Sequence, residues 1–447
     1  MAQTAFAAID EQAFKAFHWR ATLTTGLGVF CDGYDLTAVG IVLPLILKSF
    51  GGAPLTSLQS AGLASSALMG SAIGALLFGV LGQQGRRRYY GYDVLILGVT
   101  ALAQAFAPGV AWLIAIRFVL GVGVGADYVL SPMIMAEHAN RADRGRALGL
   151  GFGTMWPLGA LVSAVILLIL DGLRVPPDLE WRIVLAAGAV PALSVLYLRR
   201  TMPETARFLA RMAGDADAAA RVMAEISGAD VAPPEADARP FAEVFARHAR
   251  VIISAALLWM VYDLVVYASI LFGPSLIAGS LGFGPVAFQL IMELVFTIPP
   301  AVVMSLWVID PVGRKPLQVW GFVATAATVG AFALMQGQLA RAPTLAFLVF
   351  GLFNVAATAP GIVSGAGVLG VELAPTRIRS VAQSITVAGG RIGAALSGFF
   401  FPLLFAGVGQ AGAYWVMTGL ALLGAVLTQA LVPETGRKSL EALTEEG

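Results

Sequence analysis

The chain has 447 residues, of which 58% are hydrophobic and only 12% are charged. Because soluble domains carry about 25% charged residues, this composition excludes a water-soluble globular protein. The formal net charge is +1, so the chain lacks the basic excess of nucleic-acid-binding proteins, and no nucleic-acid partner is expected.

Long apolar stretches separated by short polar segments follow one another along the whole chain. A helix needs about 20 mainly apolar residues to cross a bilayer, so each stretch is a predicted span. The twelve predicted spans are 20–47, 58–82, 90–107, 111–137, 145–170, 181–199, 251–279, 285–308, 316–337, 343–370, 380–407 and 411–432. They predict an all-α membrane protein.

Short motifs recur in the same order in both halves of the chain, at an offset of about 230 residues. The repeated motifs are Y-D-L (34–36 and 262–264), G-R-R/K (85–87 and 313–315), P-E-T (203–205 and 433–435), and the pairs Glu137…Arg144 and Glu372…Arg379. The chain is therefore predicted to hold two pseudo-symmetric six-helix halves, 1–200 and 251–447, joined by a loop at 201–250. Parallel repeats of this kind build transporters with a site between the halves.

Most of the 28 Lys and Arg residues fall on segments that share one side of the membrane with the N-terminus. Cytoplasmic loops carry this excess of positive charge. Both termini and the central loop are thus predicted to be cytoplasmic, in a multi-pass protein of the plasma (inner) membrane.

Several motifs resemble the major facilitator superfamily, near its sugar-porter-like branch. They are G-R-R-R (85–88), R-F-V-L-G-V-G-V-G (117–125), M-P-E-T-A-R-F-L (202–209), D-P-V-G-R-K (310–315) and V-P-E-T-G-R-K-S-L-E (432–441). The resemblance covers essentially the whole chain. It implies the fold of twelve helices in two halves.

A finer likeness is to the phosphate:proton symporters. Their signature resembles G-A-D-Y-V-L-S (125–131), their seventh-span pattern resembles Trp259, Asp263 and Tyr267, and their eleventh-span pattern resembles G-R-I-G-A (390–394). The resemblance implies a substrate site that includes these three side chains and Tyr128. Met155 stands where the family carries a Gln resembling a phosphate ligand, which removes a hydrogen-bonding group. The first-half loop also lacks the family's Asp.

Six acidic residues lie inside predicted spans: Asp32, Asp35, Asp93, Asp127, Asp263 and Glu293. Charges at membrane depth are costly, so such residues are paired, face a cavity or serve function. Trp259, Asp263 and Tyr267 are spaced i, i+4, i+8 and share one helix face, which suits a polar ligand. The alternative is aromatic packing with a hydrogen bond from the Asp to a neighbouring helix.

Arg117 and Asp35 resemble an Arg–Asp pair of the sugar porters, which implies contact between the first and fourth spans. A buried Arg needs an acid because its guanidinium stays charged. Protonation of Asp35 would free Arg117 and change helix packing, although a purely structural salt bridge is the alternative.

Asp127 is the leading candidate for proton coupling, because it sits among glycine, alanine and hydrophobic residues with no cation at i±3 or i±4. Desolvation favours the protonated form of such a carboxylate. Asp263 is the second candidate. Asp32 and Glu293 are expected to make structural hydrogen bonds. For Asp93, a structural role and a functional role are equally expected.

Arg391 is the leading anion-binding candidate, since a guanidinium presents a planar fork suited to phosphate or carboxylate. Flanking glycines at 389, 390 and 393 are expected to leave room around it. Its counterpart in the first half is Trp156, beside Met155, so both residues are placed in the substrate site. The alternative is that Glu293 or Asp263 neutralises Arg391.

The charged motifs at the inner helix ends are interpreted as a gate of salt bridges, as the resemblance implies; ordinary positive-inside topology explains the arginines but not the repeated Glu. The predicted gate residues are Arg86, Glu137, Arg144, Glu204, Asp310, Arg314, Glu372, Arg379 and Glu434.

No nucleophile–base set and no metal-ligand spacing is present in the sequence, so an enzyme is not predicted, and neither is a cofactor. The sequence predicts a monomeric proton symporter driven by the proton gradient. Phosphate is the leading substrate, followed by a small organic acid and then a neutral sugar or polyol. A substrate sensor is the alternative of another class, but the tail and central loop are short for one.

Overall fold

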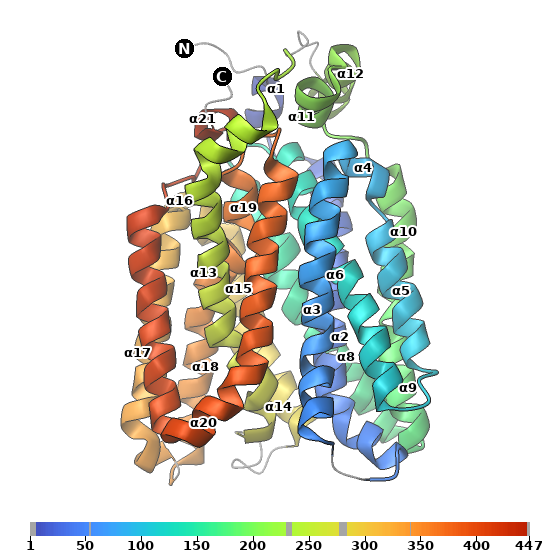
Figure 1. Cartoon of the computed structure of the whole chain (residues 1–447), viewed down its shortest axis with the longest axis vertical. Coiled ribbons are helices and arrows are strands. Elements are labelled where there is room, and N and C mark those ends of the chain that lie inside the picture. Colours follow the sequence, from blue (N-terminus) through green and yellow to red (C-terminus); the bar gives the residue numbers. More distant parts are fainter. Residues whose placement is uncertain (1–5, 53–54, 229–234, 277–283, 340, 445–447) are drawn as a thin grey trace.

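The computed structural model describes residues 6–52, 55–228, 235–276, 284–339 and 341–444 (Figure 1). In these ranges the chain forms helices joined by short loops, and no strand occurs among them. The end of the predicted span 251–279 lies outside the described residues.

The first half of the chain supplies six spans, which appear in blue to green in Figure 1. Two of them are composite, because a π-helical turn or a short break divides each into consecutive helices. The spans are α2 (Ala16–Ser49), α3 (Ser57–Leu81), α5 (Tyr92–Gln104), α6 (Val110–His138), α7 (Arg144–Leu148) with η2 (Gly149–Thr154) and α8 (Met155–Gly172), and α9 (Pro177–Ala187) with α10 (Ala189–Thr201).

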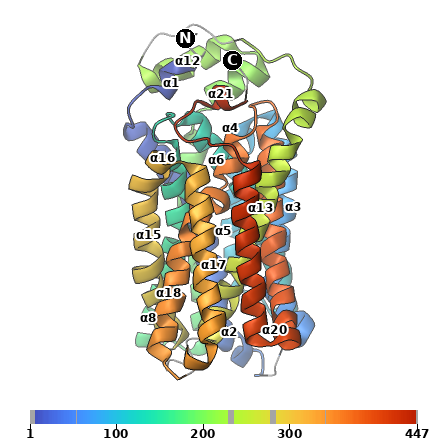
Figure 2. The ribbon, with the colours of Figure 1, turned by 90° about the vertical axis from the view of Figure 1, so that its left-hand side faces the viewer.

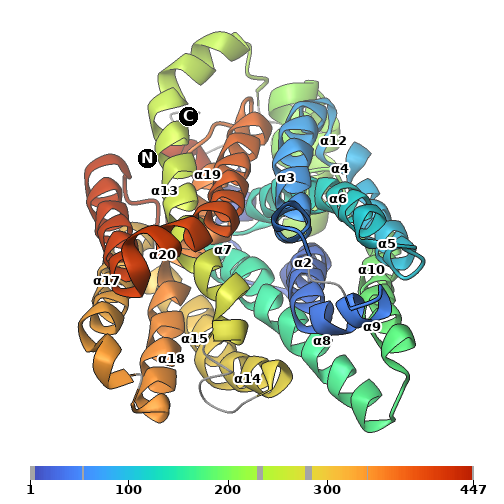
Figure 3. The same ribbon diagram turned by 60° about the horizontal axis from the view of Figure 1, so that its bottom comes forward.

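The second half repeats this arrangement in yellow-green to red. Its spans are α13 (Phe241–Leu276), the series α14 (Pro285–Ile291), η5 (Met292–Thr297), α15 (Ile298–Val303), η6 (Met304–Val308) and α16 (Ile309–Val312), then α17 (Arg314–Leu339), then α18 (Pro343–Pro360) with η7 (Gly361–Gly365) and α19 (Val368–Glu372), and finally α20 (Arg379–Leu431). Gly409, with φ 72°, breaks α20 into the last two spans. Figure 3 shows the two groups of helices side by side.

Eleven described helical segments are long and apolar enough to cross a membrane. The one predicted span outside this group is 90–107, the third in the chain. It is the 13-residue helix α5, which ends at Gln104 and is too short to count as membrane-crossing by length. The predicted all-α, twelve-span architecture is confirmed. One boundary differs, since α13 begins at Phe241, inside the segment predicted as loop.

Short helices gather at the end of the molecule that holds both termini (Figures 1 and 2). They are α1 (Ala7–Asp10), η1 (Gly82–Gln84), α4 (Arg86–Tyr89), α11 (Ala206–Phe208), η3 (Leu209–Ala213), α12 (Ala216–Ser227) and α21 (Leu440–Thr444). We refer to this as the terminal end. The helices of the central loop, α11, η3 and α12, thus pack over the terminal end.

Helices α3 and α6 pack through bare backbone. A Cβ atom on Gly121 would lie 2.0 Å from the Ala67 carbonyl oxygen, and one on Gly125 would lie 2.0 Å from the Ser71 carbonyl oxygen. These two glycines, one turn apart on α6, therefore let the two backbones touch, which is how helices associate in lipid. This packing positions Asp127 and Tyr128, which follow directly on α6.

Gly121→Ala is expected to destabilise the protein, because even a methyl group collides with the α3 backbone. Overpacking of this kind costs about 1–3 kcal/mol. Thermal melting in detergent would measure the loss, with Gly419→Ala as the matched control, because a Cβ on Gly419 of α20 meets nothing within 4 Å. Equal melting temperatures for the two variants would contradict this packing.

Candidate functional site

Arg391 of α20 lies at the centre of a buried polar cluster to which both halves contribute. Its guanidinium carbon is 4.1 Å from the Tyr128 ring centroid, and its Nη1 donates to the Tyr267 hydroxyl at 2.8 Å. Its Nη2 lies 3.3 Å from Asp32 Oδ2, which also accepts the Tyr128 hydroxyl at 3.1 Å. A guanidinium held among two phenols and a carboxylate can offer charge-assisted hydrogen bonds to an anion.

The face of α13 predicted to carry the ligand is buried against this cluster. Trp259, Asp263 and Tyr267 are each less than a tenth exposed. The Trp259 ring centroid lies 6.0 Å from that of Tyr128. Asp263 Oδ2 has no hydrogen-bond partner within the described ranges. A buried carboxylate oxygen without a partner is costly, so this atom is a natural acceptor for a proton or a ligand donor.

The sequence suggested that the glycines around Arg391 leave space beside it, but they do not. A Cβ on Gly390 would lie 2.4 Å from Trp259 Cδ1, and a Cβ on Gly393 would lie 2.4 Å from the Met260 carbonyl oxygen. These glycines let α20 approach α13 closely, because any side chain would hold the helices apart. They thereby bring Arg391 and Trp259 into one cluster.

The counter-ion of Arg391 also differs from expectation. Neither Glu293 nor Asp263 forms an ion pair with it among the described residues; Asp32, expected only to make a structural hydrogen bond, takes this place. Glu293 accepts a hydrogen bond from Gln289 at 2.7 Å on its own helical segment. Sequence reasoning missed Asp32 because nothing in the chain marks which first-span acid faces the eleventh span.

The two fifth-span residues placed in the substrate site separate in the structure. Trp156 packs against the buried cluster that contains Tyr128 and Trp259. Met155 packs on α2 instead, where a Cβ on Gly26 would lie 2.8 Å from Met155 Cγ. Trp156 therefore adjoins the Arg391 cluster, whereas Met155 contacts α2.

Arg117 and Asp35 form an ion pair with 2.8 Å between Nη1 and Oδ2. Gln104 of α5 completes the group: its Nε2 donates to Asp35 Oδ1 at 2.8 Å, and its Oε1 accepts from Arg117 at 3.3 Å. One arginine and one carboxylate neutralise each other here, and the amide bonds to both of them.

Asp127 is held by a buried cation, Arg199, which sequence reasoning missed. Arg199 of α10 donates to Asp127 Oδ1 at 2.5 Å and makes a short contact with Asp93 Oδ2. Ser131 also donates to Asp127 Oδ1, at 2.6 Å. Asp127 indeed has no cation one turn away on its own helix, but Arg199 reaches it from the sixth span. The expected isolation of this carboxylate is therefore corrected. Two carboxylates share a single buried guanidinium.

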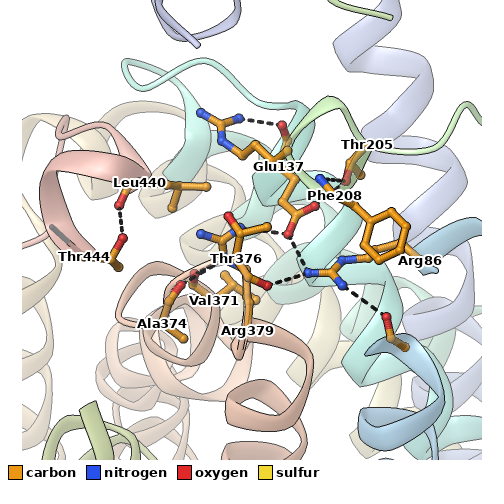
Figure 4. A network of polar contacts seen from close by, with 12 residues as sticks. Arg86, Glu137, Thr205, Phe208, Val371, Ala374, Thr376, Arg379, Leu440 and Thr444 are labelled. Atoms are coloured by element: carbon orange, nitrogen blue, oxygen red, sulfur yellow. Dashed lines mark hydrogen bonds and ion pairs between the residues drawn. The ribbon is translucent and has the colours of Figure 1, made fainter. Parts of the chain in front are cut away.

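At the terminal end, two ion-pair networks join the halves with the pseudo-symmetry of the sequence repeat. Figure 4 shows the network around Glu137. Glu137 of the first half pairs with Arg379 of the second at 2.8 Å and with Arg86 at 3.3 Å. In the mirror arrangement, Glu372 pairs with Arg144 at 2.8 Å and with Arg314 at 3.0 Å. A threonine of each P-E-T motif donates a short hydrogen bond to the glutamate of its own half. These contacts close the terminal end.

The contacts of Asp310, which also pairs with Arg314 at 2.8 Å, have no symmetric equivalent in the first half. Asp310 accepts the backbone N–H groups of Gly145 and Arg146, at 3.0 and 2.7 Å, across the interface between halves. Gly82 occupies the equivalent place in the first half and offers only its carbonyl, to Arg86 at 3.1 Å. The Asp missing from the first loop thus removes an inter-half hydrogen-bond acceptor.

Glu204 and Glu434 were grouped with the inter-helix salt bridges, but they bind backbone within their own halves. Glu204 accepts the Arg87 N–H at 3.0 Å. Glu434 accepts the N–H groups of Arg314 and Lys315 at 2.9 and 3.0 Å. Both carboxylates therefore cap the helix that begins there, α4 or α17.

Arg207, outside the predicted set, ties the N-terminal segment to the C-terminal tail. Its guanidinium pairs with Asp10 at 2.8 Å and with Glu441 at 2.7 Å. Burial alone raises the pKa of Glu441, but Arg207 outweighs it, so the pKa of this carboxyl lies below its usual value. Burial dominates at Asp10 and raises the pKa of that carboxyl. The P-E-T-A-R motif could have indicated Arg207, because this Arg follows closely after the predicted gate residue Glu204.

In the described residues no group of three His, Cys, Asp or Glu side chains could hold a metal ion. Residues 21–446 match the model of the sugar (and other) transporter family. The chain belongs to this family. It is a multi-pass membrane transporter of the major facilitator superfamily.

Named relatives in this family are similar over nearly the whole chain. The chain is 30% identical to a probable inorganic phosphate transporter 1-6 of Arabidopsis thaliana, over 98% of this chain and 96% of the relative. It is 32% identical to a probable inorganic phosphate transporter 1-10 of Oryza sativa subsp. japonica, over 97% and 91%. Among solved structures, the proton:xylose symporter XylE bound to 6-bromo-6-deoxy-D-glucose has the same fold, with a TM-score of 0.81 at 24% identity over 96% of this chain and 99% of that one.

Glu137→Gln and Glu372→Gln are expected to open the terminal end, because breaking a buried ion pair costs about 3–5 kcal/mol. Ser305→Cys provides the reporter, since Ser305 is buried against Gly149 of the other half. Cys31, the one native cysteine, is buried. Both Gln variants should increase the rate at which an impermeant maleimide labels position 305.

Glu204→Gln is the matched control, because Glu204 bonds within its own half. Its labelling rate should equal that of the Ser305→Cys parent. Indistinguishable rates in all three Gln variants would reduce Glu137 and Glu372 to topology signals.

Proposed function

We propose that this protein is a proton-coupled symporter of a small anion, working by alternating access, with phosphate as the leading substrate. The observation that supports this most is the setting of Arg391: a buried guanidinium with two phenols and an indole beside it, between the two halves. The fork geometry of guanidinium suits a tetrahedral oxyanion or a carboxylate. The relatives named as phosphate transporters agree with this choice.

The charges of the cluster suggest how protons and substrate are coupled. Asp32 and Asp263 lie near Arg391, so two carboxylates accompany one cation. An incoming anion would meet a net negative site unless a carboxylate takes up a proton. Protonation therefore makes the guanidinium available to the substrate, which links proton binding to anion binding.

The Asp93–Arg199–Asp127 group repeats this imbalance. Two carboxylates and one arginine leave one negative charge in the membrane interior, and one proton neutralises it. The Arg117–Asp35 pair is already neutral. Charge counting thus favours Asp127 or Asp93 and Asp32 or Asp263 as the proton carriers, and gives Asp35 and Arg117 a role only if the pair separates during the cycle.

Two other substrates are weighed against phosphate. A small organic acid offers the same charge and would also bind Arg391. A neutral sugar or polyol is favoured only by the fold shared with the xylose symporter, and it could not replace the Asp32 carboxylate as a partner of Arg391. A substrate sensor that does not transport would need only the substrate-binding steps of this cycle. We propose the plasma membrane as location, with the terminal end cytoplasmic.

Arg391→Ala is expected to abolish binding of labelled phosphate, whereas Arg391→Lys should weaken it less, because Lys keeps the charge but loses the fork. Binding to purified protein and uptake into proteoliposomes under an imposed pH gradient would measure both. Carboxylates and sugars are the comparison ligands. If the protein binds a neutral sugar and Arg391→Ala leaves that affinity unchanged, the anion proposal is wrong.

Asp127→Asn is expected to abolish uptake driven by a pH gradient while preserving exchange of substrate between the two sides. The amide mimics the protonated acid, and its oxygen can still accept from Arg199 and Ser131, so the loaded carrier can reorient. Asp93→Asn tests the partner carboxylate. If Asp127→Asn keeps full pH-driven accumulation, the coupled proton belongs to Asp93, Asp32, Asp263 or Asp35.

A further inference from the structure

A separate basic cavity lies at the terminal end, away from the Arg391 cluster. Its volume is about 300 Å³, and it is lined by Arg87 and Arg88 of α4, Arg200 at the end of α10, and Glu204. Helices α4 and α10 adjoin in Figure 1, at the level where the spans end. The transport cycle described above uses none of these side chains except Glu204, which caps α4.

The arginines of this cavity are held in place without being neutralised. Arg87 Nη2 donates to the Arg200 carbonyl oxygen at 3.2 Å, and Arg200 Nη1 donates to the Arg88 carbonyl oxygen at 3.4 Å. Arg88 stacks on the Tyr89 ring at 5.6 Å, and Arg200 stacks on Tyr92 at 5.2 Å. In the described part of the chain, none of the three forms an ion pair with a carboxylate. Backbone and rings orient these guanidinium groups, so their remaining donors are free to bind an anion.

Glu204 does not cancel this charge. Its Oε2 accepts the Arg87 N–H at 3.0 Å, and its Oε1 accepts the Thr205 N–H at 2.9 Å, so both oxygens already serve backbone donors. Three guanidinium groups against one carboxylate leave a net positive cavity at the membrane boundary.

The surface beneath the cavity is apolar and exposed. Along α10, Val190, Leu193 and Tyr197 follow one another at helical spacing on the way to Arg200, and all three are exposed. Helix α5 packs beside α10 and adds further exposed apolar residues, Tyr92, Leu95 and Val99. A positive cavity above an apolar stripe matches an amphiphile with an anionic head and a hydrocarbon chain. Tyr92 and Tyr197 are of the residue type that marks the membrane interface.

The second half of the chain shows that the fold does not require this charge. At the offsets of the G-R-R/K and P-E-T repeats, Arg88 corresponds to Pro316 and Arg200 to Ala430, and only Arg87 keeps a cationic partner, Lys315. Topology alone would place positive charge at both inner rims. The cluster is a feature of one half alone, which indicates a specific use.

We propose that this cavity binds the phosphate head of an anionic phospholipid, with the acyl chains lying along α5 and α10. The lipid would be a structural ligand at the junction of α4, α5 and α10, distinct from the transported substrate. Arg88 and Arg200 supply the contacts to the phosphate. Arg87 supports Arg200 by donating a hydrogen bond to the Arg200 carbonyl oxygen. This inference stands whether or not the transported substrate is phosphate.

Native mass spectrometry of the purified protein with added phosphatidylglycerol tests the proposal, with phosphatidylcholine as the zwitterionic comparison. The wild type should retain one phosphatidylglycerol more firmly than phosphatidylcholine. Arg88→Gln with Arg200→Gln should weaken that binding about tenfold or more, because each basic residue near a membrane surface contributes strongly to anionic-lipid affinity. Arg88→Gln alone, which leaves the Arg200 contacts in place, should lose part of the effect. Lys315→Gln, the counterpart in the other half, should lose none.

Three results would overturn the proposal. One is equal retention of phosphatidylglycerol by the wild type and the double variant. Another is equal retention of the two lipids by the wild type. The third is displacement of the bound lipid by inorganic phosphate at similar concentrations, which would identify a site for the free anion. Melting curves recorded without anionic lipid would confirm that the variants are folded.

Discussion

A guanidinium group stays charged even inside a membrane, and this constraint organises the polar interior of the protein. Arg117, Arg199 and Arg391 lie on α6, α10 and α20, and each is almost completely buried. Each draws carboxylates from other helices, because an isolated buried charge is far more costly than a paired one. Residues distant in the chain, such as Asp32 and Arg391, therefore meet, and the helices that carry them must pack around the pair. The close glycine contacts of α3 with α6 and of α13 with α20 are what make that packing possible.

The ratio of carboxylates to arginines then separates the three groups by role. Arg117 and Asp35 match one to one, and Gln104 bonds to both, so the group connects α2, α5 and α6 without excess charge. The Arg199 and Arg391 groups each hold one carboxylate too many. An excess negative charge at membrane depth has to be met by a proton or by a rearrangement. In the proposed cycle, charge imbalance is thus the property that distinguishes the groups that take up a proton from the group that does not.

The sequence predicted the spans, the repeat and the gate because these depend on local composition and on motifs that recur at one offset. It predicted the α13 face because Trp259, Asp263 and Tyr267 share a helical period. It missed Arg199, whose two carboxylate partners are 72 and 106 residues away, and Asp32, whose partner is 359 residues away. Long-range partners of this kind depend on how helices rotate against each other, which periodicity does not report. The glycines near Arg391 were misjudged for the same reason: a missing side chain can signify space or contact, and only the neighbouring helix decides which.

At the terminal end, the Glu–Arg pairs that join the halves are symmetric, but the contacts of Asp310 have no equivalent in the first half. Glu137 with Arg379 and Glu372 with Arg144 cross the interface equivalently, so breaking one set without the other leaves buried charges unpaired. This coupling favours two discrete states, closed or open, over partial opening. Asp310 adds inter-half hydrogen bonds that Gly82 cannot reproduce, so the contact between α16 and α7 holds an extra restraint in the closed state. If the terminal end acts as the proposed gate, the symmetric pairs favour two discrete states, and the missing carboxylate makes the two sides of the interface separate unequally.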